Sequence, residues 1–250
     1  MKRVTKKDVY AKYGIEYKKE RILSPAGWIR PVLKNNNTKT GERVYTFSMP
    51  AGTAGTCVMN CPNCYAMAGF YTTPSVQESL KTMQSLIENH IDFMHRAICA
   101  QIVADGVKMV RIHASGDFNT KNSAEYTAMW FNVARVFKDV KFWTYTKMPQ
   151  YESLFDGLNN ANIVPSVLPY KIGLNYGTCA DVLKMYSMMK KHGLTPHICE
   201  CGTNDAHHCQ DCAGCSANKY VLFIMHSSKT YDAKTDPLLK DVAEIVNTQR

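Results

Sequence analysis

The placement of the ten cysteines constrains this 250-residue chain more than any other feature of its sequence. Three lie between residues 57 and 64, and five lie between residues 199 and 215. No apolar segment follows the basic N-terminal residues, so we expect a cytoplasmic protein in a reducing compartment. Close thiols in such a compartment indicate metal sites rather than disulfides. The two isolated cysteines, Cys99 and Cys179, are expected to be small buried side chains.

Composition sets the general class of the protein. Hydrophobic residues make up 45% and charged residues 20% of the chain, which is typical of a globular protein and excludes a disordered one. The longest apolar run, from Tyr220 to Met225, is far too short to span a bilayer, so no membrane partner is expected.

Hydrophobic periodicity predicts alternating strands and helices. Helices are expected from Ser75, as the first residue of a capping box, to Gly106, and at 123–137, 180–191 and 236–248. Strands are expected at 27–33, 43–48, 107–112, 140–145, 163–167, 171–174, 196–198 and 220–225. This alternation predicts an α/β fold, either an incomplete (β/α) barrel or an open, mostly parallel sheet.

Four segments follow from this pattern. Residues 1–50 are expected to form a basic strand or hairpin extension, and residues 51–198 an α/β core that binds a cluster. Residues 199–219 are expected to be a cysteine-rich metal loop, and residues 220–250 to add the last strand and helix of the core.

The first cysteine cluster has the spacing C-x3-C-x2-C, formed by Cys57, Cys61 and Cys64. Structural zinc normally requires four protein ligands. Three thiolates on one loop, with no obvious fourth ligand, favour an iron–sulfur cubane that leaves one iron open. An open iron can bind a small molecule through an amine and a carboxylate.

This motif, on the loop after the first strand, resembles the signature of the radical S-adenosylmethionine (SAM) superfamily. The resemblance implies a radical SAM-like fold and a [4Fe-4S] cluster on the three cysteines, with SAM at the fourth iron. It also implies cleavage of SAM to methionine and a 5′-deoxyadenosyl radical that acts on a substrate, and an electron donor of the flavodoxin or ferredoxin type. The sequence names neither the substrate nor a catalytic residue.

A second segment supports this resemblance. Ser115, Gly116 and Asp117 follow the next strand, where radical SAM enzymes carry a Gly-Gly-Glu-like segment that holds the methionine amine of SAM. Alternatively, Asp117 or Asn119 caps the following helix. The superfamily usually has an aromatic residue directly before the third cysteine, whereas this chain has Asn63 there and Tyr65 after it. Either Tyr65 faces the adenine or that contact is absent.

The chain also looks similar to the phage gene-product-88 family over residues 35–220. That resemblance implies the fold and the cluster and no particular reaction. It is carried by four segments, Pro50-Ala51-Gly52, Cys64-Tyr65-Ala66, Arg111 to Phe118 and Phe142 to Lys147.

The second cysteine cluster has the ferredoxin-like spacing C-x2-C-x2-C at Cys209, Cys212 and Cys215. Cys201 or Cys199 can supply a fourth thiolate, which closes the centre. An auxiliary [4Fe-4S] cluster is the first interpretation and a structural zinc site the second, because zinc bound by four cysteines is equally sound chemistry.

Other residues add weaker predictions. Lys147 leaves an apolar strand at the edge where parallel α/β proteins bind ligands, so we expect it to contact the cofactor. His113 is expected to be a core histidine. The formal charge is +9, and tyrosines interleave the basic residues of the N-terminus, so the segment contacts nucleic acid or is a solvated face. These residues are Lys2, Arg3, Lys6, Lys7, Tyr10, Lys12, Tyr13, Tyr17, Lys18, Lys19, Arg21 and Arg30.

Three functions follow in order of preference. The first is an iron–sulfur enzyme of the radical SAM type acting on an unknown substrate. The second is a zinc-stapled nucleic-acid-binding protein without turnover. The third is an iron–sulfur redox protein that does not use SAM.

Overall fold

The computed structural model describes residues 4–35, 41–59, 61, 64–200, 208–212, 214–225 and 231–249. The largest sheet consists of β4 (Val44–Thr46), β5 (Met109–Arg111), β6 (Lys141–Thr146) and β7 (Ala161–Pro165). Its strands are all parallel and follow the order β4-β5-β6-β7. The carboxyl ends of four successive strands therefore lie along one edge, which is where the predicted site residues are placed.

A second parallel sheet has the order β10-β12-β11. It is formed by β10 (Tyr176–Gly177), β11 (Pro196–Ile198) and β12 (Tyr220–Ile224). β12 lies against β7, so the two sheets are neighbours. The predicted α/β fold with parallel sheets is confirmed, and the strands of the described residues form no closed barrel.

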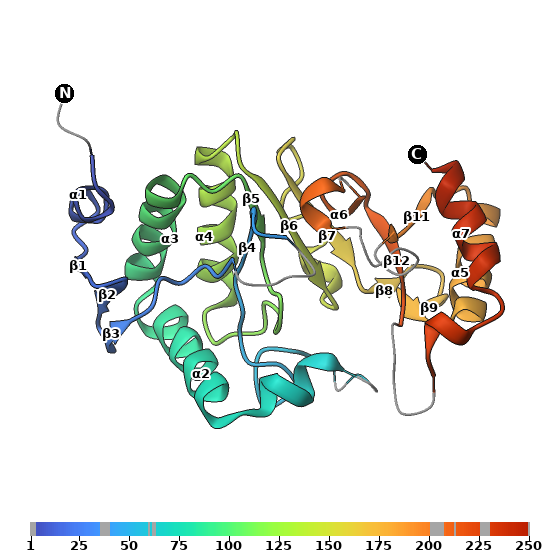
Figure 1. Cartoon of the computed structure of the whole chain (residues 1–250), viewed down its shortest axis with the longest axis horizontal. Coiled ribbons are helices and arrows are strands. Elements are labelled where there is room, and N and C mark those ends of the chain that lie inside the picture. Colours follow the sequence, from blue (N-terminus) through green and yellow to red (C-terminus); the bar gives the residue numbers. More distant parts are fainter. Residues whose placement is uncertain are drawn as a thin grey trace.

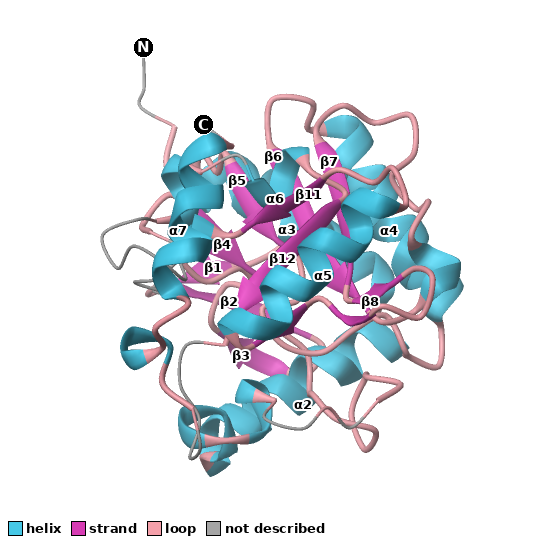
Figure 2. Ribbon diagram, turned by 90° about the vertical axis from the view of Figure 1, so that its right-hand side faces the viewer, coloured by secondary structure: helices cyan, strands magenta, loops and turns pink. Residues whose placement is uncertain are grey.

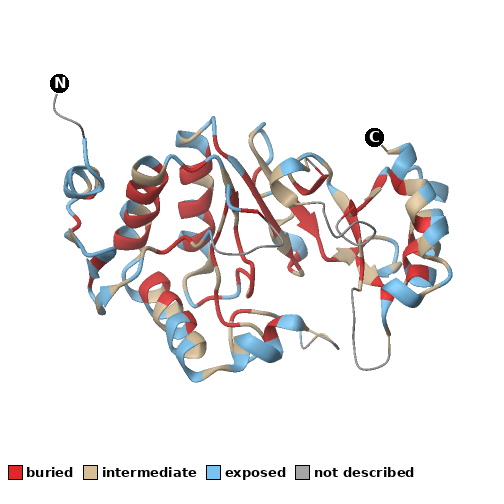
Figure 3. Cartoon of the chain, viewed as in Figure 1, coloured by how far each residue is buried: buried red, intermediate tan, exposed pale blue. Residues whose placement is uncertain are grey.

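Helices cover the outer faces of both sheets. The longer ones are α2 (Pro74–Asn89), α3 (Ile91–Asp105), α4 (Ser123–Val136), α5 (Cys179–Lys191) and α7 (Leu239–Thr248). Figure 1 shows α3 and α4 on one side of the main sheet, with the second sheet and helices α5 and α7 on the other. Figure 2 shows β11 and β12 behind α5 and α7. The buried residues gather on α3, α4 and the strands beside them (Figure 3).

Short elements complete the chain. They are α1 (Lys6–Lys12), β1 (Tyr17–Lys18), β2 (Arg21–Ser24), β3 (Gly27–Ile29), β8 (Val167–Leu168), β9 (Gly173–Leu174) and α6 (Gly214–Ala217), and the 3₁₀ turns 65–67, 69–72, 149–151, 209–211 and 233–235. β1, β2 and β3 form an antiparallel sheet, and β8 pairs antiparallel with β9.

The predicted helix from Ser75 to Gly106 is wrong in its continuity, because the chain breaks at His90 into α2 and α3. The apolar residues keep helical spacing across the break, so periodicity alone does not reveal it. Ser75 does not cap α2 either, since the helix begins at Pro74 and its N-cap is Thr73. Gly106 ends α3 as predicted, in the left-handed conformation with φ 61°.

The strand expected at 27–33 extends only to Ile29, where β3 pairs with β2. Leu33 beyond it is buried, and its backbone exchanges two hydrogen bonds with the side-chain amide of Gln101 on α3, at 2.8 and 2.9 Å. Those bonds replace strand partners. The strand expected at 43–48 is β4, which pairs with β5, so the main sheet begins within the first fifty residues.

The structure has an N-terminal helix, α1, that the basic sequence does not predict. It packs on α3 through the buried Tyr10, whose ring stacks on Tyr17 at 4.9 Å between centroids. Lys6 forms an ion pair of 2.8 Å with Asp105 at the end of α3. Tyr10 and Tyr17 therefore pack against the protein and are not exposed for stacking on nucleic-acid bases. Lys2 and Arg3 lie outside the described residues.

Candidate functional site

The loop that carries the first cysteines is fixed to the end of β5. The backbone N–H of Met49 donates to the carbonyl of Ser115 at 2.9 Å, and the Ser115 hydroxyl donates back to the Met49 carbonyl at 2.8 Å. Ser115 is buried. The chain leaving β4 therefore runs beside the chain leaving β5.

Thr56 extends this fixation to the residue before Cys57. Its hydroxyl donates to the Pro50 carbonyl at 2.9 Å and accepts from the backbone N–H of Asp117 at 3.0 Å. Gly116 has φ 85°, and a Cβ there would lie 2.6 Å from both Met49 Cβ and Thr56 Oγ1. Only glycine fits this close approach of two backbones.

The Asp117 carboxylate joins the same loop to β6. It accepts from the Thr146 hydroxyl at 2.8 Å, the Lys147 backbone N–H at 2.9 Å and the Phe118 backbone N–H at 2.8 Å. The side chain is only 2% exposed. The alternative role of Asp117 or Asn119 as a helix cap is wrong, because α4 begins at Ser123 after the N-cap residue Asn122. These three hydrogen bonds use most of the acceptor sites of the carboxylate, so its main role is structural.

Cys57 directly follows Thr56 of this network, and its backbone N–H donates to the Gly52 carbonyl at 3.2 Å. Burial raises the pKa of its thiol to about 11, partly offset by a hydrogen bond with the Gly52 backbone. Smaller electrostatic effects come from Asp117 and Cys64, which raise the pKa, and from Lys147, whose positive charge lowers it and so favours the thiolate.

Cys61 and Cys64 face the second sheet. Burial, followed by the nearby Cys61 and Cys64 thiols, raises the pKa of Tyr176 on β10 to about 12. The backbone N–H of Cys64 donates to the Cys61 carbonyl at 3.3 Å. Cys61 and Cys64 therefore lie near Tyr176 of β10, whereas Cys57 follows the network at the carboxyl edge of the main sheet.

Tyr65 follows the third cysteine and remains 57% exposed. Its hydroxyl donates to the carbonyl of Ala114 and accepts from Arg111 Nη2 at 3.2 Å. Its ring makes an edge contact with Tyr71 at 5.7 Å. The structure brings Tyr65 to the end of β5, beside the predicted cofactor-binding segment.

The chemistry of the first cysteine cluster suits a metal centre, but its present arrangement does not yet form one. Three soft sulfur donors on one loop fit an iron–sulfur cluster. In the described part of the chain, no group of three or more His, Cys, Asp or Glu side chains is already arranged to hold a metal ion. Cluster binding at Cys57, Cys61 and Cys64 remains a prediction that requires the thiols to turn toward a common centre.

The second cysteine cluster surrounds a small cavity. Cys199, Cys209, Cys212 and Cys215 line it together with Trp143 and Ser216. The structure therefore places Cys199 beside the three cysteines that were grouped from their spacing. Cys201, the other candidate for the fourth thiolate, lies outside the described residues.

Arg111 connects the two regions and was not selected as a site residue from the sequence. Its guanidinium lies 4.9 Å from the centroid of the Tyr145 ring, and the Tyr145 hydroxyl donates to Cys215 Sγ at 3.0 Å. Its Nη2 reaches Tyr65, as described above. The sequence signal that points to Arg111 is a charged residue at the carboxyl end of a short, largely apolar strand.

His113 is a core histidine, as predicted. Its imidazole is hydrogen-bonded to Thr144 at 3.2 Å and Tyr126 at 2.7 Å. Burial lowers its pKa to about 3, so the ring is neutral at physiological pH.

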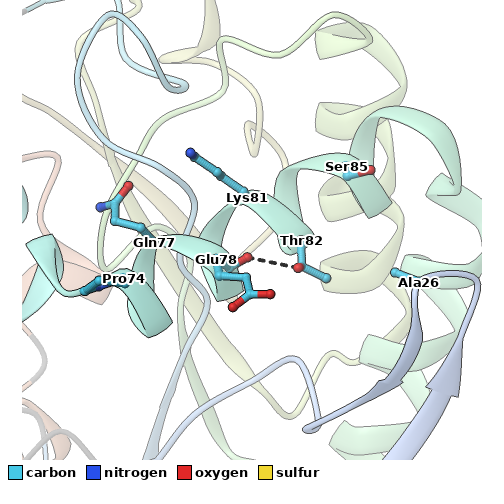
Figure 4. A pocket seen from close by; sticks show the side chains of 7 residues that line it. All are labelled: Ala26, Pro74, Gln77, Glu78, Lys81, Thr82 and Ser85. Atoms are coloured by element: carbon cyan, nitrogen blue, oxygen red, sulfur yellow. Dashed lines mark hydrogen bonds between the residues drawn. The ribbon is translucent and has the colours of Figure 1, made fainter.

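A separate surface pocket lies between α2 and the β2–β3 turn (Figure 4). Figure 4 shows Glu78 and Lys81 among its polar lining, and the Thr82 hydroxyl bonded to the Glu78 carbonyl at 2.9 Å. It shares no lining residue with either cysteine cluster. No helix in the described part of the chain has the length and apolar character needed to cross a membrane.

Comparison with known proteins identifies one family. A comparison with curated proteins and one with solved structures find no match. The family model described as Gene product 88 matches residues 30–169, which include β4 to β7, the first three cysteines and the Ser115–Asp117 segment. Because this match covers more than half of the chain, the protein belongs to the gene product 88 family.

Proposed function

We propose that the protein is an iron–sulfur enzyme of the radical SAM type, with Cys57, Cys61 and Cys64 as the cluster ligands. The observation that carries the proposal is the fixation of the cysteine loop to the carboxyl ends of β5 and β6. Thr56, directly before the first cysteine, bonds to the Asp117 backbone, and Asp117 bonds to Thr146 and Lys147. This places a three-thiol loop where parallel α/β proteins bind their ligands.

The donor set supports a cluster with one open iron. Three thiolates satisfy three irons of a [4Fe-4S] cluster, and the fourth position accepts a small molecule. When bound, such a cluster supplies the electron that cleaves SAM to methionine and a 5′-deoxyadenosyl radical. The protein's contribution is to bind, orient and exclude water.

The surrounding residues divide into two roles. Ser115, Gly116 and Asp117 act as positioning residues that hold the cysteine loop, because their polar groups are used within the protein. The exposed ring of Tyr65 and the half-buried Lys147 are the groups that we expect to contact a ligand at the cysteines. An ammonium at Lys147 matches the carboxylate of SAM.

The proposal requires a reductant that the chain does not contain. A single electron must come from a separate redox protein, for which a flavodoxin or ferredoxin is the natural class. Its docking face must approach the cysteine loop, since electron transfer weakens steeply with distance.

The decisive experiment is anaerobic. The full chain is purified without oxygen, its iron and acid-labile sulfide are measured, and it is then reduced with dithionite in the presence of SAM. We expect four irons at the first centre and formation of 5′-deoxyadenosine. Cys61→Ser should abolish both, whereas Cys99→Ser, which changes a buried cysteine on α3, should leave both unchanged.

A pair of lysine substitutions tests whether Lys147 contacts SAM. Lys147→Met should weaken SAM binding while the iron content stays at the wild-type value. Lys141→Met, at the exposed start of the same strand, is the control. Equal SAM affinity in all three proteins would exclude Lys147 from the site.

A second candidate is an iron–sulfur redox protein without SAM. It is favoured by the burial of Asp117, because the segment expected to hold the methionine amine serves the loop instead. Iron at the first centre without formation of 5′-deoxyadenosine would select this function.

A further inference from the structure

We propose that Cys199, Cys209, Cys212 and Cys215 bind a single zinc ion, and that Arg111 provides the compensating positive charge. The site goes beyond the proposed function and does not require the first centre. Its fourth ligand is Cys199 rather than Cys201.

The position of the four cysteines indicates a closed, structural site. They line one cavity together with Trp143 and Ser216, and they come from segments that are attached to different strands. A closed set of four thiolates suits a structural ion without redox chemistry, which zinc commonly provides. Four thiolates around one ion are the usual ligands of structural zinc.

Binding requires the four sulfur atoms to move toward a common centre, because no group of three or more His, Cys, Asp or Glu side chains among the described residues is already arranged to hold a metal ion. The ion replaces four thiol protons, which pass to solvent, and the product is one zinc ion with four thiolates and a net charge of −2.

The local backbone already has the form of a metal-binding turn. The N–H of Cys212 donates to the Cys209 carbonyl at 3.3 Å, and the N–H of Gly214 donates to Cys212 Sγ at 3.2 Å. An N–H directed at sulfur stabilises the thiolate form. A Cβ at Gly214 would lie 2.6 Å from His197 Nε2 and 3.2 Å from Cys212 Sγ, so glycine is required beside the ligand.

Two different elements anchor the outer ligands. Cys199 continues β11, and its N–H donates to the Leu222 carbonyl of β12 at 2.8 Å. The Cys215 carbonyl accepts from the Asn162 side chain of β7 at 2.9 Å. The ion would therefore join the second sheet to the main sheet.

A third anchor holds the turn between Cys209 and Cys212. Arg43, next to β4, forms an ion pair with Asp211 at 2.9 Å, and its backbone N–H donates to the Gln210 side chain at 3.2 Å. The turn is thus attached to the opposite edge of the main sheet from β7.

The charge of Arg111 is the second, independent observation. Its Nε is sealed from solvent without a hydrogen-bond partner, and none of the ion pairs among the described residues includes it. Its electrostatic neighbours are two tyrosines and the thiols of Cys209 and Cys215. Arg111 as a whole is half-buried, but a guanidinium with a sealed Nε and no carboxylate partner is unfavourable unless its neighbours are anionic. Zinc-bound thiolates supply that negative charge.

Metal analysis tests the ligand set. The full chain carrying Cys57→Ser, Cys61→Ser and Cys64→Ser lacks the first centre, so any metal that it retains belongs to the second. We expect one zinc per chain and no iron, retained after a further Cys201→Ser and lost after Cys199→Ser. Four irons per chain, no metal, or loss with Cys201→Ser and retention with Cys199→Ser would each overturn the proposal.

Cobalt substitution covers the case in which Cys199→Ser does not fold. The Cys201→Ser protein, with the first centre also removed, is reconstituted with Co²⁺ in place of zinc. Intense tetrahedral d–d bands with charge transfer from four thiolates are expected. A spectrum with three thiolates would contradict the assignment of Cys199.

Arg111 is tested as a positioning residue by zinc affinity. Arg111→Met should lower the affinity for zinc ten- to a hundredfold in competition with a chelator, as partners of metal ligands commonly do. Arg111→Lys, which keeps the charge, should recover part of that loss. Arg135→Met, at an exposed position on α4, is the control. An unchanged affinity in Arg111→Met would remove its role.

Discussion

At the scale of single residues, burial without a charged partner determines how His113 behaves. The residue follows β5 at φ 58°, an unusual conformation for a side chain other than glycine. Its two ring nitrogens are hydrogen-bonded to neutral hydroxyls, so nothing nearby favours the charged imidazole. Burial is the physical cause that lowers its pKa from 6.5 to about 3.

This shift predicts a pH dependence of stability. The folded protein keeps His113 neutral down to about pH 3, whereas the unfolded chain binds a proton below pH 6.5. The contribution of His113 to the free energy of unfolding therefore has its full value above pH 6.5. As the pH falls toward 3, this contribution decreases by about 1.4 kcal/mol per pH unit, because only the unfolded chain takes up the proton. His113→Asn, which tolerates positive φ, should flatten the curve of unfolding free energy between pH 6.5 and 5, measured with urea. Parallel curves for the two proteins would contradict the assignment.

A second prediction at the residue scale concerns Tyr10 of α1. Its ring is 1% exposed, but its buried hydroxyl has no hydrogen-bond partner. Tyr10→Ala should lower the free energy of unfolding by about 3 kcal/mol through lost packing. Tyr10→Phe should be neutral or stabilising, because it removes an unsatisfied polar group. Denaturant unfolding measures both, with the exposed Lys12→Ala as the control, and a large loss in Tyr10→Phe would show that the hydroxyl is bonded.

At the scale of elements, the loops after β4, β5 and β6 form one network. Gly116 provides a matched comparison, because Gly157 has the same φ of 85° with no atom within 4 Å of an added Cβ. Gly157→Ala should cost about 1 kcal/mol from backbone strain alone. Gly116→Ala should cost roughly 2 kcal/mol more, since it also separates the cysteine loop from β5. Equal losses in the two variants would mean that the contact with Met49 and Thr56 is not tight.

At the scale of the whole molecule, two apolar cores meet at the second cysteine cluster. One core contains β5, α3 and α4, and the other contains α5, α7 and β12. A small cluster that includes Trp143, Val164, Cys215 and Val221 lies between them. The proposed zinc ion would therefore lie at the junction of the two cores, beside this small cluster.

Hydrogen exchange tests this junction. Removal of zinc by a chelator should reduce the protection of amides in β12 and α5, while amides in β5 and α4 keep theirs, because the larger core is self-sufficient. Mass spectrometry of peptides before and after chelation measures the change. A uniform loss across both cores, or none in β12, would show that the ion does not hold the junction.

Hydrophobic periodicity along the chain is enough to predict many of the helices and strands. The sequence alone predicts α4, α5, α7 and the buried strands β5, β6 and β12, because alternating or helical burial repeats within each element. It also groups the cysteines into two clusters, since neighbours in the chain stay neighbours in space. It does not reveal the break at His90, where the apolar spacing continues, nor the helix α1, whose core contacts come from α3.

The partners of the site residues depended on contacts between distant segments. The sequence determined that three thiols share one loop and that a carboxylate follows β5. Only the tertiary structure decided that Asp117 supports the cysteine loop, that Arg111 lies beside the second cluster and that Cys199 lines its cavity. Strand order brings these groups together across tens of residues, and burial then determines which of them remain available to a ligand, so neither can be obtained from spacing along the chain.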